Sequence, residues 1–200
     1  SMALLDGRRF TTVEVLGAYG WHLTLDAVKW LLDWHLIRGI NLFFPHAFFY
    51  SIRGRRAYES EPDLGVHNPW WPHWGVVADY IRRLCWLFTD ADEVCEAAVL
   101  CDPDHLPWAA AKALYEAQVT FLYVSPETLS EATLDAAGRL RLGRAGIGVA
   151  VLLADPSPLA VPPDTSALLE RWTAAGGRVV REWTPESLRS TLTQSDSGMP

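Results

Sequence analysis

The stretch EAAVLCDPDHLPWAAAKALYEAQVTFLYV, residues 96–124, decides the fold class of this 200-residue chain. Its first six residues are an apolar strand of the kind that a sheet buries, and 119–124 repeat that pattern. Between them, 107–118 have helical character, with Pro107 at the first turn of the predicted helix. A strand, a helix and a second apolar strand in this order predict parallel pairing, because a crossover helix is the usual connection between parallel strands.

The alternation of helix and strand continues on both sides of this stretch. A helix is predicted over 75–88, and the later elements follow at the spacing of βα units: helix 126–137, one apolar strand at 147–153, helix 165–175, strand 178–181 and a last helix from residue 184. Ser125 and Pro126 suit the first positions of the helix at 126. We therefore expect 76–190 to form a doubly wound, parallel, flavodoxin-like α/β layer, followed by a disordered polar tail at 191–200.

Residues 1–75 have a different character, rich in aromatic residues and histidine, with loops of Pro, Gly, Asn and Arg. VEV at 13–15 indicates the end of a strand, 24–38 a helix capped by Thr24, and INLFF at 40–44 a buried strand. Together they predict one βαβ unit. The loop that follows, 45–75, is longer than a plain connection, and loops of this length in compact domains usually carry function.

Composition excludes several functional classes. A formal charge of −7 and a pI near 5.3 argue against nucleic acid, whose binders carry clustered positive charge. No apolar run approaches the roughly 20 residues that a membrane span needs. Three cysteines without a CxxC pair indicate neither a disulfide framework nor a zinc site, and they favour the cytoplasm. The six histidines show no close metal-ligand spacing, and AGIGVA at 145–150 is not a dinucleotide motif, so we expect no metal and no cofactor.

Side chains suited to sugar chemistry follow both strands of the βαβ unit. Glu14, Tyr19 and Trp21 come with the first strand, and His46 and Tyr50 follow the second. The carboxyl ends of parallel strands share one edge, where βα-barrel enzymes build their active sites. Glycoside hydrolysis needs a carboxylate to meet an oxocarbenium-like centre and flat apolar faces to hold sugar rings. A solvated loop glutamate is the competing interpretation of Glu14.

The long loop also carries Arg53, Arg55 and Arg56. Such a run is typically a solvated part of a loop, and this is our interpretation. The alternative is a site for an anionic sugar or a phosphate group.

Three stretches together resemble a known family. VEVLGAYGW (13–21), LTLDAVKWLLDWHLIRGINLFFPHAFFYS (23–51) and HNPWWPHW (67–74) are similar, in this order, to the closing strands of large bacterial TIM-barrel glycoside hydrolases, among them the family 106 α-L-rhamnosidases. LLERWTAAGGRVV (168–180) resembles the glutamine-amidotransferase-like domain that follows the barrel in several such enzymes. The resemblance implies that 1–75 are the last strands and active-site loops of a barrel, and that 76–190 are an amidotransferase-like domain.

The resemblance also implies roles for single residues. Glu14 would be the strand-borne catalytic carboxylate. The carbohydrate substrate would be bound by the other candidates, namely Tyr19, Trp21, His46, Tyr50, His67, Asn68, Trp70, Trp71 and Trp74. However, a barrel needs eight strands and a glycosidase needs two carboxylates, whereas 1–75 supply two strands and no strand-end partner for Glu14. We therefore expect a C-terminal piece of a glycosidase that is inactive alone.

A non-catalytic α/β module is the alternative function. Such a module would serve oligomerisation, with a homo-oligomer as the assembly, or would bind carbohydrate without cleaving it. Tryptophan usage bears on both hypotheses, because ten tryptophans in 200 residues is an unusually high number. Trp30, Trp34, Trp86 and Trp172 fall within predicted helices and are expected to pack there, while the tryptophans of the loops are expected to face sugar.

Overall fold

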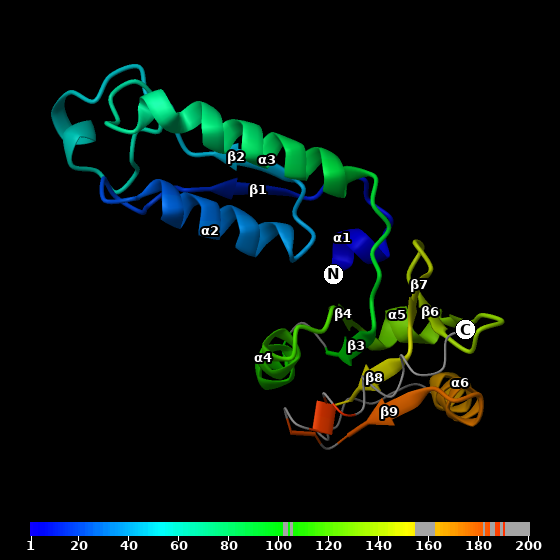
Figure 1. Cartoon of the computed structure of the whole chain (residues 1–200). Coiled ribbons are helices and arrows are strands. Elements are labelled where there is room, and N and C mark those ends of the chain that lie inside the picture. The colour runs from blue at the N-terminus through cyan, green and yellow to red at the C-terminus, as the bar shows by residue number, and fades with distance from the viewer. Residues whose placement is uncertain are drawn as a thin grey trace. The chain divides into compact units, whose positions relative to one another are not determined.

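The computed structural model of the chain describes residues 1–101, 104, 106–154, 163–181, 183–184, 187–188 and 190 (Figure 1). Contacts divide the chain into two units, Arg8–Asp92 and a second unit that joins Ser1–Gly7 to Glu93–Pro200. We name them the βαβ unit and the sheet unit. The composition change at residue 75 does not coincide with this division, because the helix that follows it belongs to the βαβ unit. The tail at 191–200 lies outside the described residues.

The βαβ unit contains the predicted strand, helix and strand, with a second helix after the long loop. Thr24 caps the first helix as expected, since its Oγ1 accepts the N–H of Ala27 at 3.2 Å. The two strands pair in parallel, so their carboxyl ends lie side by side. The elements are β1 (Thr12–Val15), α2 (Leu25–Leu36), β2 (Leu42–Pro45), the 3-10 turns η1 (Gly54–Ala57) and η2 (Trp71–His73), and α3 (Trp74–Thr89).

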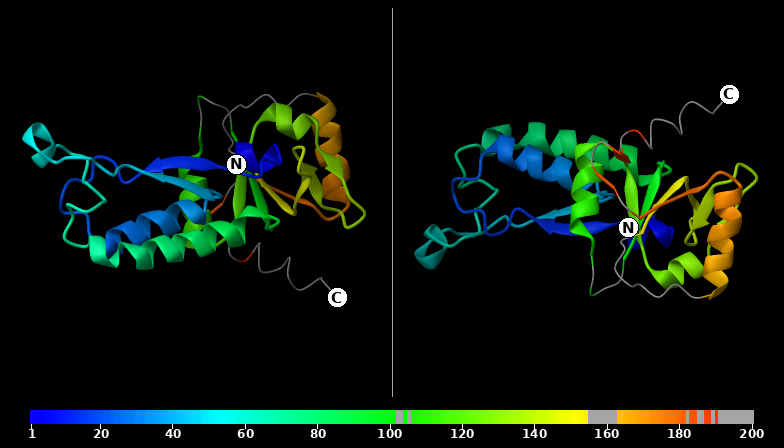
Figure 2. Two further views of the ribbon diagram at one scale, coloured as in Figure 1. Left: turned by 90° about the horizontal axis from the view of Figure 1, so that it is seen from above. Right: turned by 90° about the horizontal axis from the view of Figure 1, so that it is seen from below.

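Both helices of this unit cover the same face of the β1–β2 pair (Figure 2). Val13, Val15 and Phe43 point to that face and form a core with α2 and α3. The alternate side chains of β2, Leu42 and Phe44, are 37% and 57% exposed, so the expectation of a buried strand at 40–44 is wrong. The physical reason is that a helix layer on one face leaves the other face of this described two-stranded sheet without cover.

The helical tryptophans do not all pack as expected. Trp172 has no exposed surface, and its indole N–H donates to the carbonyl oxygen of Gly138 at 3.0 Å. Trp30 and Trp34 of α2 and Trp86 of α3 are 63%, 40% and 78% exposed. The expected packing of these three is therefore wrong, because they lie outside the stripe of buried residues that turns each helix toward the core.

The sheet unit is built on four parallel strands in the order β4-β3-β8-β9. The fold class is thus mixed α/β with mostly parallel strands. Residues 187, 188 and 190 are helical, in agreement with a last helix after residue 184. The strands of this sheet and the helices of the unit are β3 (Ala97–Leu100), β4 (Phe121–Val124), β8 (Val151–Leu153), β9 (Arg178–Val180), α1 (Met2–Leu5), α4 (Trp108–Glu116), α5 (Pro126–Ser130) and α6 (Pro163–Ala174).

Helices cover both faces of the four-stranded sheet. Successive residues of β3 alternate between the faces: Ala97 and Val99 pack with α4, whereas Ala98 and Leu100 pack with α5 and α6 around Trp172. Burial on both faces explains why the sequence of each strand is almost continuously apolar.

The predicted helix at 126–137 is wrong in its length. It begins as expected, with the Ser125 hydroxyl accepting the N–H of Thr128 and with Pro126 at the first helical position. It ends at Ser130, and β5 (Thr133–Leu134) follows. The reason is a turn at Asp135, whose Oδ1 accepts the N–H groups of the residues two and four positions later at 2.9 and 2.8 Å.

The apolar run at 147–153 is two strands rather than one. Its first half is β7 (Ile147–Val149), which pairs antiparallel with β6 (Leu140–Leu142) and not with the parallel sheet. Its second half is β8, in the middle of the parallel sheet. Gly143 and Gly146 have positive φ of 63° and 64°, so RLGRAG at 141–146 closes a tight turn that the apolar pattern alone concealed.

Candidate functional site

The carboxyl ends of β1 and β2 bring together side chains that are far apart in the sequence. The register pairs Glu14 with Phe44 and Val15 with Pro45. The N–H of His46 then donates to the carbonyl oxygen of Val15 at 2.8 Å, which extends the pairing by one residue. Because side chains alternate along a strand, Glu14 points away from the helix-covered core and is exposed.

The loop that follows β1 has an unusual backbone. Leu16 and Ala18 have positive φ of 73° and 55°, a region that such side chains rarely adopt and that is often found at functional sites. The side chain of Leu16 is buried in the core, which holds this conformation. Gly17 lies against the ring of His46, since a Cβ at this position would be 3.1 Å from His46 Nδ1. The loop is therefore packed closely onto the residue that follows β2.

These segments line a cavity of about 380 Å³, within the usual size range of small-molecule sites. The predicted candidates Glu14, Tyr19 and His46 meet in it, each from a different segment of the chain. The peptide bond between His46 and Ala47 is cis. The full lining is Glu14, Val15, Leu16, Gly17, Ala18, Tyr19, His35, His46 and Glu61.

Two ionisable residues of this lining, His35 and Glu61, were not predicted as site residues. His35 lies among apolar residues at a helical position, a pattern typical of a structural histidine, and its Nδ1–H donates to the carbonyl oxygen of Leu31 at 2.7 Å. Its Nε2 is then the acceptor in the neutral ring. Glu61 comes from the long loop, where the neighbouring Ser60 accepts the N–H of Gly20 at 2.6 Å through its carbonyl oxygen. Only the length of the loop signalled that it carries function, and nothing in the sequence singled out Glu61.

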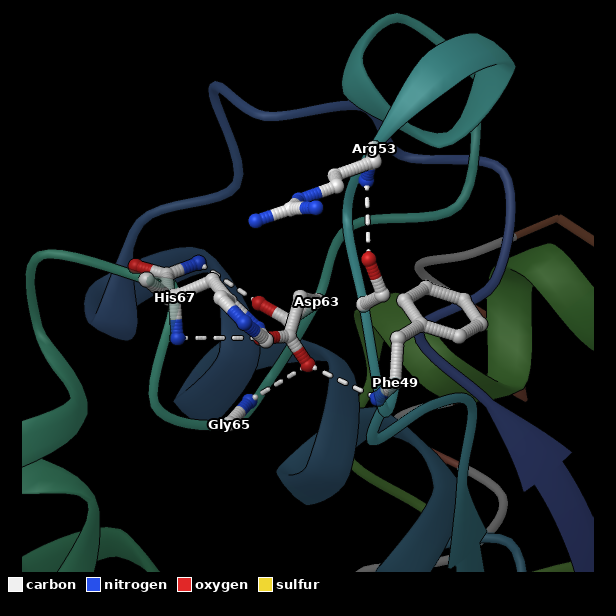
Figure 3. Close-up of polar contacts among 7 residues, drawn as sticks. Phe49, Arg53, Asp63, Gly65 and His67 are labelled. Carbon is white, nitrogen blue, oxygen red and sulfur yellow. Dashed lines mark hydrogen bonds and ion pairs between the residues drawn. The ribbon is translucent and has the colours of Figure 1, made fainter.

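Asp63 organises the long loop (Figure 3). Its side chain is fully buried, and Oδ1 accepts the backbone N–H groups of Phe49 and Gly65 at 3.0 Å each. Oδ2 accepts the backbone N–H of His67 at 3.1 Å and the Nδ1–H of the same residue at 2.7 Å. Burial alone would raise the pKa of Asp63, but these hydrogen bonds outweigh it and hold the pKa below its ordinary value. One ionised carboxylate thus joins the segment after β2 to the segment before α3.

His67 and Asn68 belong to this arrangement rather than to the lining of the cavity. His67 donates twice to Asp63, and the side-chain amide of Asn68 donates to the Asp63 carbonyl oxygen at 2.9 Å. The sequence signal for Asp63 was the DLG triplet, because an aspartate that accepts the N–H two residues later forms a common loop motif.

The loop tryptophans also lie outside the cavity lining. Trp70 and Trp74 stack with ring centroids 5.5 Å apart, and the indole N–H of Trp70 donates to the carbonyl oxygen of Leu23 at 3.1 Å. Trp71 is 37% exposed and makes an edge contact with Phe48 at 5.9 Å. The structure therefore gives Trp70 and Trp74 contacts with the core and leaves Trp71 at the surface.

Trp21 and Tyr50 complete the list of predicted site residues. Trp21 is half-buried, and within the described residues its indole N–H has no hydrogen-bond partner. Tyr50 is fully exposed. Neither residue lines the cavity.

The arginines of the long loop lie outside the cavity lining as well. Arg56 forms an ion pair with Glu59 at 3.0 Å and lies over the ring of Phe49 at 4.3 Å. Arg53 and Arg55 are exposed. This agrees with the interpretation of a solvated run.

The sheet unit has a cavity of its own, of about 730 Å³, but none of the residues predicted to form the site lines it. Its lining is Ser166, Leu169, Glu170, Thr173, Ala174, Val179 and Arg181. Cys95 and Cys101 are buried cysteines that form no disulfide, and burial raises the pKa of Cys95 to about 12. His105, the histidine nearest to Cys101 in the sequence, lies outside the described residues. Across the described ranges, no three His, Cys, Asp or Glu side chains gather in a way that could hold a metal ion.

None of the helices in the described part of the chain has the length and apolar character to cross a membrane. No protein-family model matches the sequence, and no curated protein matches it. A solved structure of a rhamnosidase from Novosphingobium sp. PP1Y is similar to this chain, with a TM-score of 0.58 and 15% sequence identity. The match covers 97% of this chain and 23% of the rhamnosidase, so the chain spans about a quarter of that protein's length. At this identity the likeness establishes a shared fold.

Proposed function

We propose that this chain is the closing part of a barrel-type glycoside hydrolase similar to the α-L-rhamnosidases, and that the cavity at β1 and β2 is part of its sugar site. The observation that carries the proposal is the meeting of Glu14, Tyr19 and His46 in one cavity at the carboxyl ends of two parallel strands. The fold that 97% of the chain shares with a rhamnosidase supports the proposal independently.

Glu14 is the catalytic carboxylate of this proposal. It lies on the face of the β1–β2 pair that the helices leave uncovered, which is the interior face when such strands close into a barrel. There it would act on the glycosidic oxygen or stabilise the oxocarbenium-like centre, while Tyr19 and His46 bind sugar hydroxyls. Tyr50 and Trp71, which are exposed beyond the cavity, are proposed as outer sugar contacts.

We propose further that the sheet unit is an amidotransferase-like, flavodoxin-like domain without glutaminase activity. The order β4-β3-β8-β9, in parallel and with helices on both faces, supports a doubly wound arrangement. The buried state of Cys95 and Cys101 argues against a nucleophilic thiol. Free thiols are typical of reducing compartments, so we propose a cytoplasmic location.

Hydrolysis of an aryl α-L-rhamnoside tests the proposed function. We expect turnover by the full-length protein that the gene encodes, and none by this chain alone, because two strands cannot form a barrel of eight. Glu14→Gln in the full-length protein should lower kcat at least about a hundredfold, which is typical for the loss of an acid–base group. Glu59→Gln is the control, since Glu59 pairs with Arg56 outside the cavity. Unchanged turnover in Glu14→Gln would remove Glu14 from the mechanism.

A non-catalytic module for oligomerisation or carbohydrate binding is the second candidate. The exposure of Trp30, Trp86 and Phe44 favours it, because large apolar side chains at the surface often belong to interfaces. Light scattering at micromolar concentration distinguishes the two functions. A stable homo-oligomer without affinity for sugars would favour the module.

A further inference from the structure

The cavity carries two carboxylates and no cationic side chain. Glu14 from β1 and Glu61 from the long loop both line it, whereas no lysine or arginine is among its lining residues. In the part of the chain that the structure describes, neither carboxylate takes part in an ion pair. Two unpaired negative charges in one concave space create a negative potential that water screens less than it would on a flat surface.

The two carboxylates and His35 supply the cavity with acceptors, while Tyr19 and His46 can each donate one hydrogen bond. An ionised carboxylate can only accept, and each has two oxygens. His35 uses its Nδ1–H on the carbonyl oxygen of Leu31, which leaves an acceptor at Nε2 in the neutral ring. A ligand with many O–H or N–H donors therefore matches this lining. A ligand that carries its own carboxylate or phosphate would place acceptors against acceptors and negative charge against negative charge.

We propose that Glu61 is a specificity-determining residue, which makes this cavity select neutral and positively charged sugars over anionic ones. The proposal rests on the proposed function, because it takes the cavity as a sugar site, and it adds the charge class of the ligand. Glu14 lies on a strand, and its proposed role is that of the catalytic carboxylate. Glu61 lies on a loop and has no proposed catalytic role. Replacing Glu61 therefore removes its charge from the cavity and leaves the catalytic carboxylate in place.

The chain contains a matched control for Glu61. Glu59 lies two residues earlier in the same loop and has the same charge, but its carboxylate pairs with Arg56 at 3.0 Å and does not line the cavity. Glu61→Gln and Glu59→Gln therefore remove the same charge from the same loop, and only the first removes it from the cavity.

Ligand-observed NMR titrations of the 200-residue chain measure the selection. The probes differ in charge on a related ring: methyl α-D-glucopyranoside, D-glucuronate and isofagomine, whose nitrogen replaces the anomeric carbon, with methyl α-L-rhamnopyranoside and the L-rhamno-configured analogue of isofagomine as a second set. The titrations are made at pH 7.5, where imidazole is generally neutral. These iminosugars are more basic than 1-deoxynojirimycin and are largely protonated at this pH. Circular dichroism of each variant checks that it is folded.

We expect the iminosugars to bind most tightly, the neutral glycosides next and glucuronate least. Glu61→Gln should weaken iminosugar binding about tenfold, because it removes one charge-assisted hydrogen bond, and should narrow the gap between the neutral glycoside and glucuronate. Glu59→Gln should leave the order and the affinities unchanged. The preference for iminosugars should also weaken at 1 M salt, where charges are screened within about 3 Å.

Three results would overturn the proposal: glucuronate binding as tightly as the neutral glycoside, a Glu61→Gln variant with unchanged selectivity, or no sugar bound at all. These outcomes are separate from failure of the proposed function, which is read from hydrolysis by the full-length protein. Iminosugar selection without hydrolysis would leave this inference standing and remove the enzymatic one. Hydrolysis together with equal binding of glucuronate would do the reverse.

Discussion

Replacement of Asp63 by asparagine tests whether one buried carboxylate holds the long loop in place. The wild-type side chain accepts four N–H groups, two from Phe49 and Gly65 on one oxygen and two from His67 on the other. Asparagine has nearly the same shape, but only one of its two terminal groups is an acceptor. The less costly orientation turns the NH₂ group toward His67, whose Nδ1 can accept an N–H in its other neutral tautomer. The backbone N–H of His67, which is partly buried, then loses its acceptor.

The expected cost follows from that donor and from the lost charge. A buried donor left without a partner costs about 1–3 kcal/mol, and a hydrogen bond to a charged group contributes roughly 1.5–3 kcal/mol against about 1 kcal/mol for a neutral one. One unsatisfied donor, together with weaker bonds to the remaining acceptor, gives a loss of about 2–4 kcal/mol in the free energy of opening this loop. Asp92→Asn is the control, because Asp92 is exposed, and it should change that free energy by less than about 0.5 kcal/mol.

Hydrogen exchange of peptides from residues 46–70 measures the loss locally. A local readout is needed because the chain divides into two units, and a single two-state unfolding transition is not assured. The effect should also depend on pH. The pKa of Asp63 is lowered in the folded chain, so its stabilisation is complete above the unfolded pKa of about 3.9 and is lost as pH falls through the lower folded value. The difference between wild type and Asp63→Asn should therefore be full at pH 7 and shrink only below about pH 4. A difference under about 1 kcal/mol at pH 7 would refute the reasoning.

Two further predictions concern the backbone after β1 and the thiols. Ala18→Gly should raise the free energy of opening of the βαβ unit by about 1 kcal/mol, because glycine adopts the positive φ of 55° without strain. Ala27→Gly in helix α2 should lower it by about the same amount. Hydrogen exchange of peptides from this unit checks the opposite signs, and a loss of stability in both variants would contradict the strain argument. Burial raises the pKa of Cys95 to about 12. Its alkylation by iodoacetamide at pH 8 should therefore be at least about a hundredfold slower in the native chain than in guanidinium, as followed by mass spectrometry. Equal rates in the two states would contradict the burial of this thiol.

The meeting of Glu14 with His46 could be predicted from the sequence because it depends on local elements and one pairing rule. Thr24 begins helix α2, Gly39 follows its end, and the short connections leave parallel pairing of the flanking strands as the natural arrangement. Parallel strands that point the same way bring their following residues to one edge. Each step needs information from only a few neighbouring residues.

Glu61 could not be predicted, because no local rule places it. Its position depends on how residues 45–75 fold back, which is decided by hydrogen bonds between residues distant in sequence, such as the N–H of Phe49 to Asp63. The same limit explains the loop tryptophans. The tryptophans of HNPWWPHW could stack on sugar rings or pack against the core, and the sequence is compatible with both. The tertiary hydrogen bond from Trp70 to the carbonyl oxygen of Leu23 distinguishes the two for Trp70.

The wrong predictions in the sheet unit have a different origin. Local turn residues indicated the correct structure, but the hydrophobic and helical patterns around them were stronger. The predicted helix at 126–137 runs past Asp135, although an aspartate followed three residues later by glycine, here Gly138, is typical of a turn. The apolar pattern at 147–153 predicts one strand, because hydrophobicity does not tell which sheet a residue joins. The two glycines of RLGRAG at 141–146 are typical of a tight hairpin turn and indicate where the first strand begins.

The exposed face of the β1–β2 pair connects these observations to function. Parallel sheets are normally covered on both faces, yet Leu42 and Phe44 of this pair are 37% and 57% exposed on the face that also carries Glu14. An apolar face without cover is unfavourable in water, so these residues are better explained by an environment that further strands or a ligand would complete. In a closed barrel this face is the interior, and residues on it near the carboxyl ends of the strands, as Glu14 is, lie at the end that carries the active site. The exposure that contradicted the expectation of a buried strand is therefore the same feature that favours Glu14 as a site residue over a solvated loop glutamate.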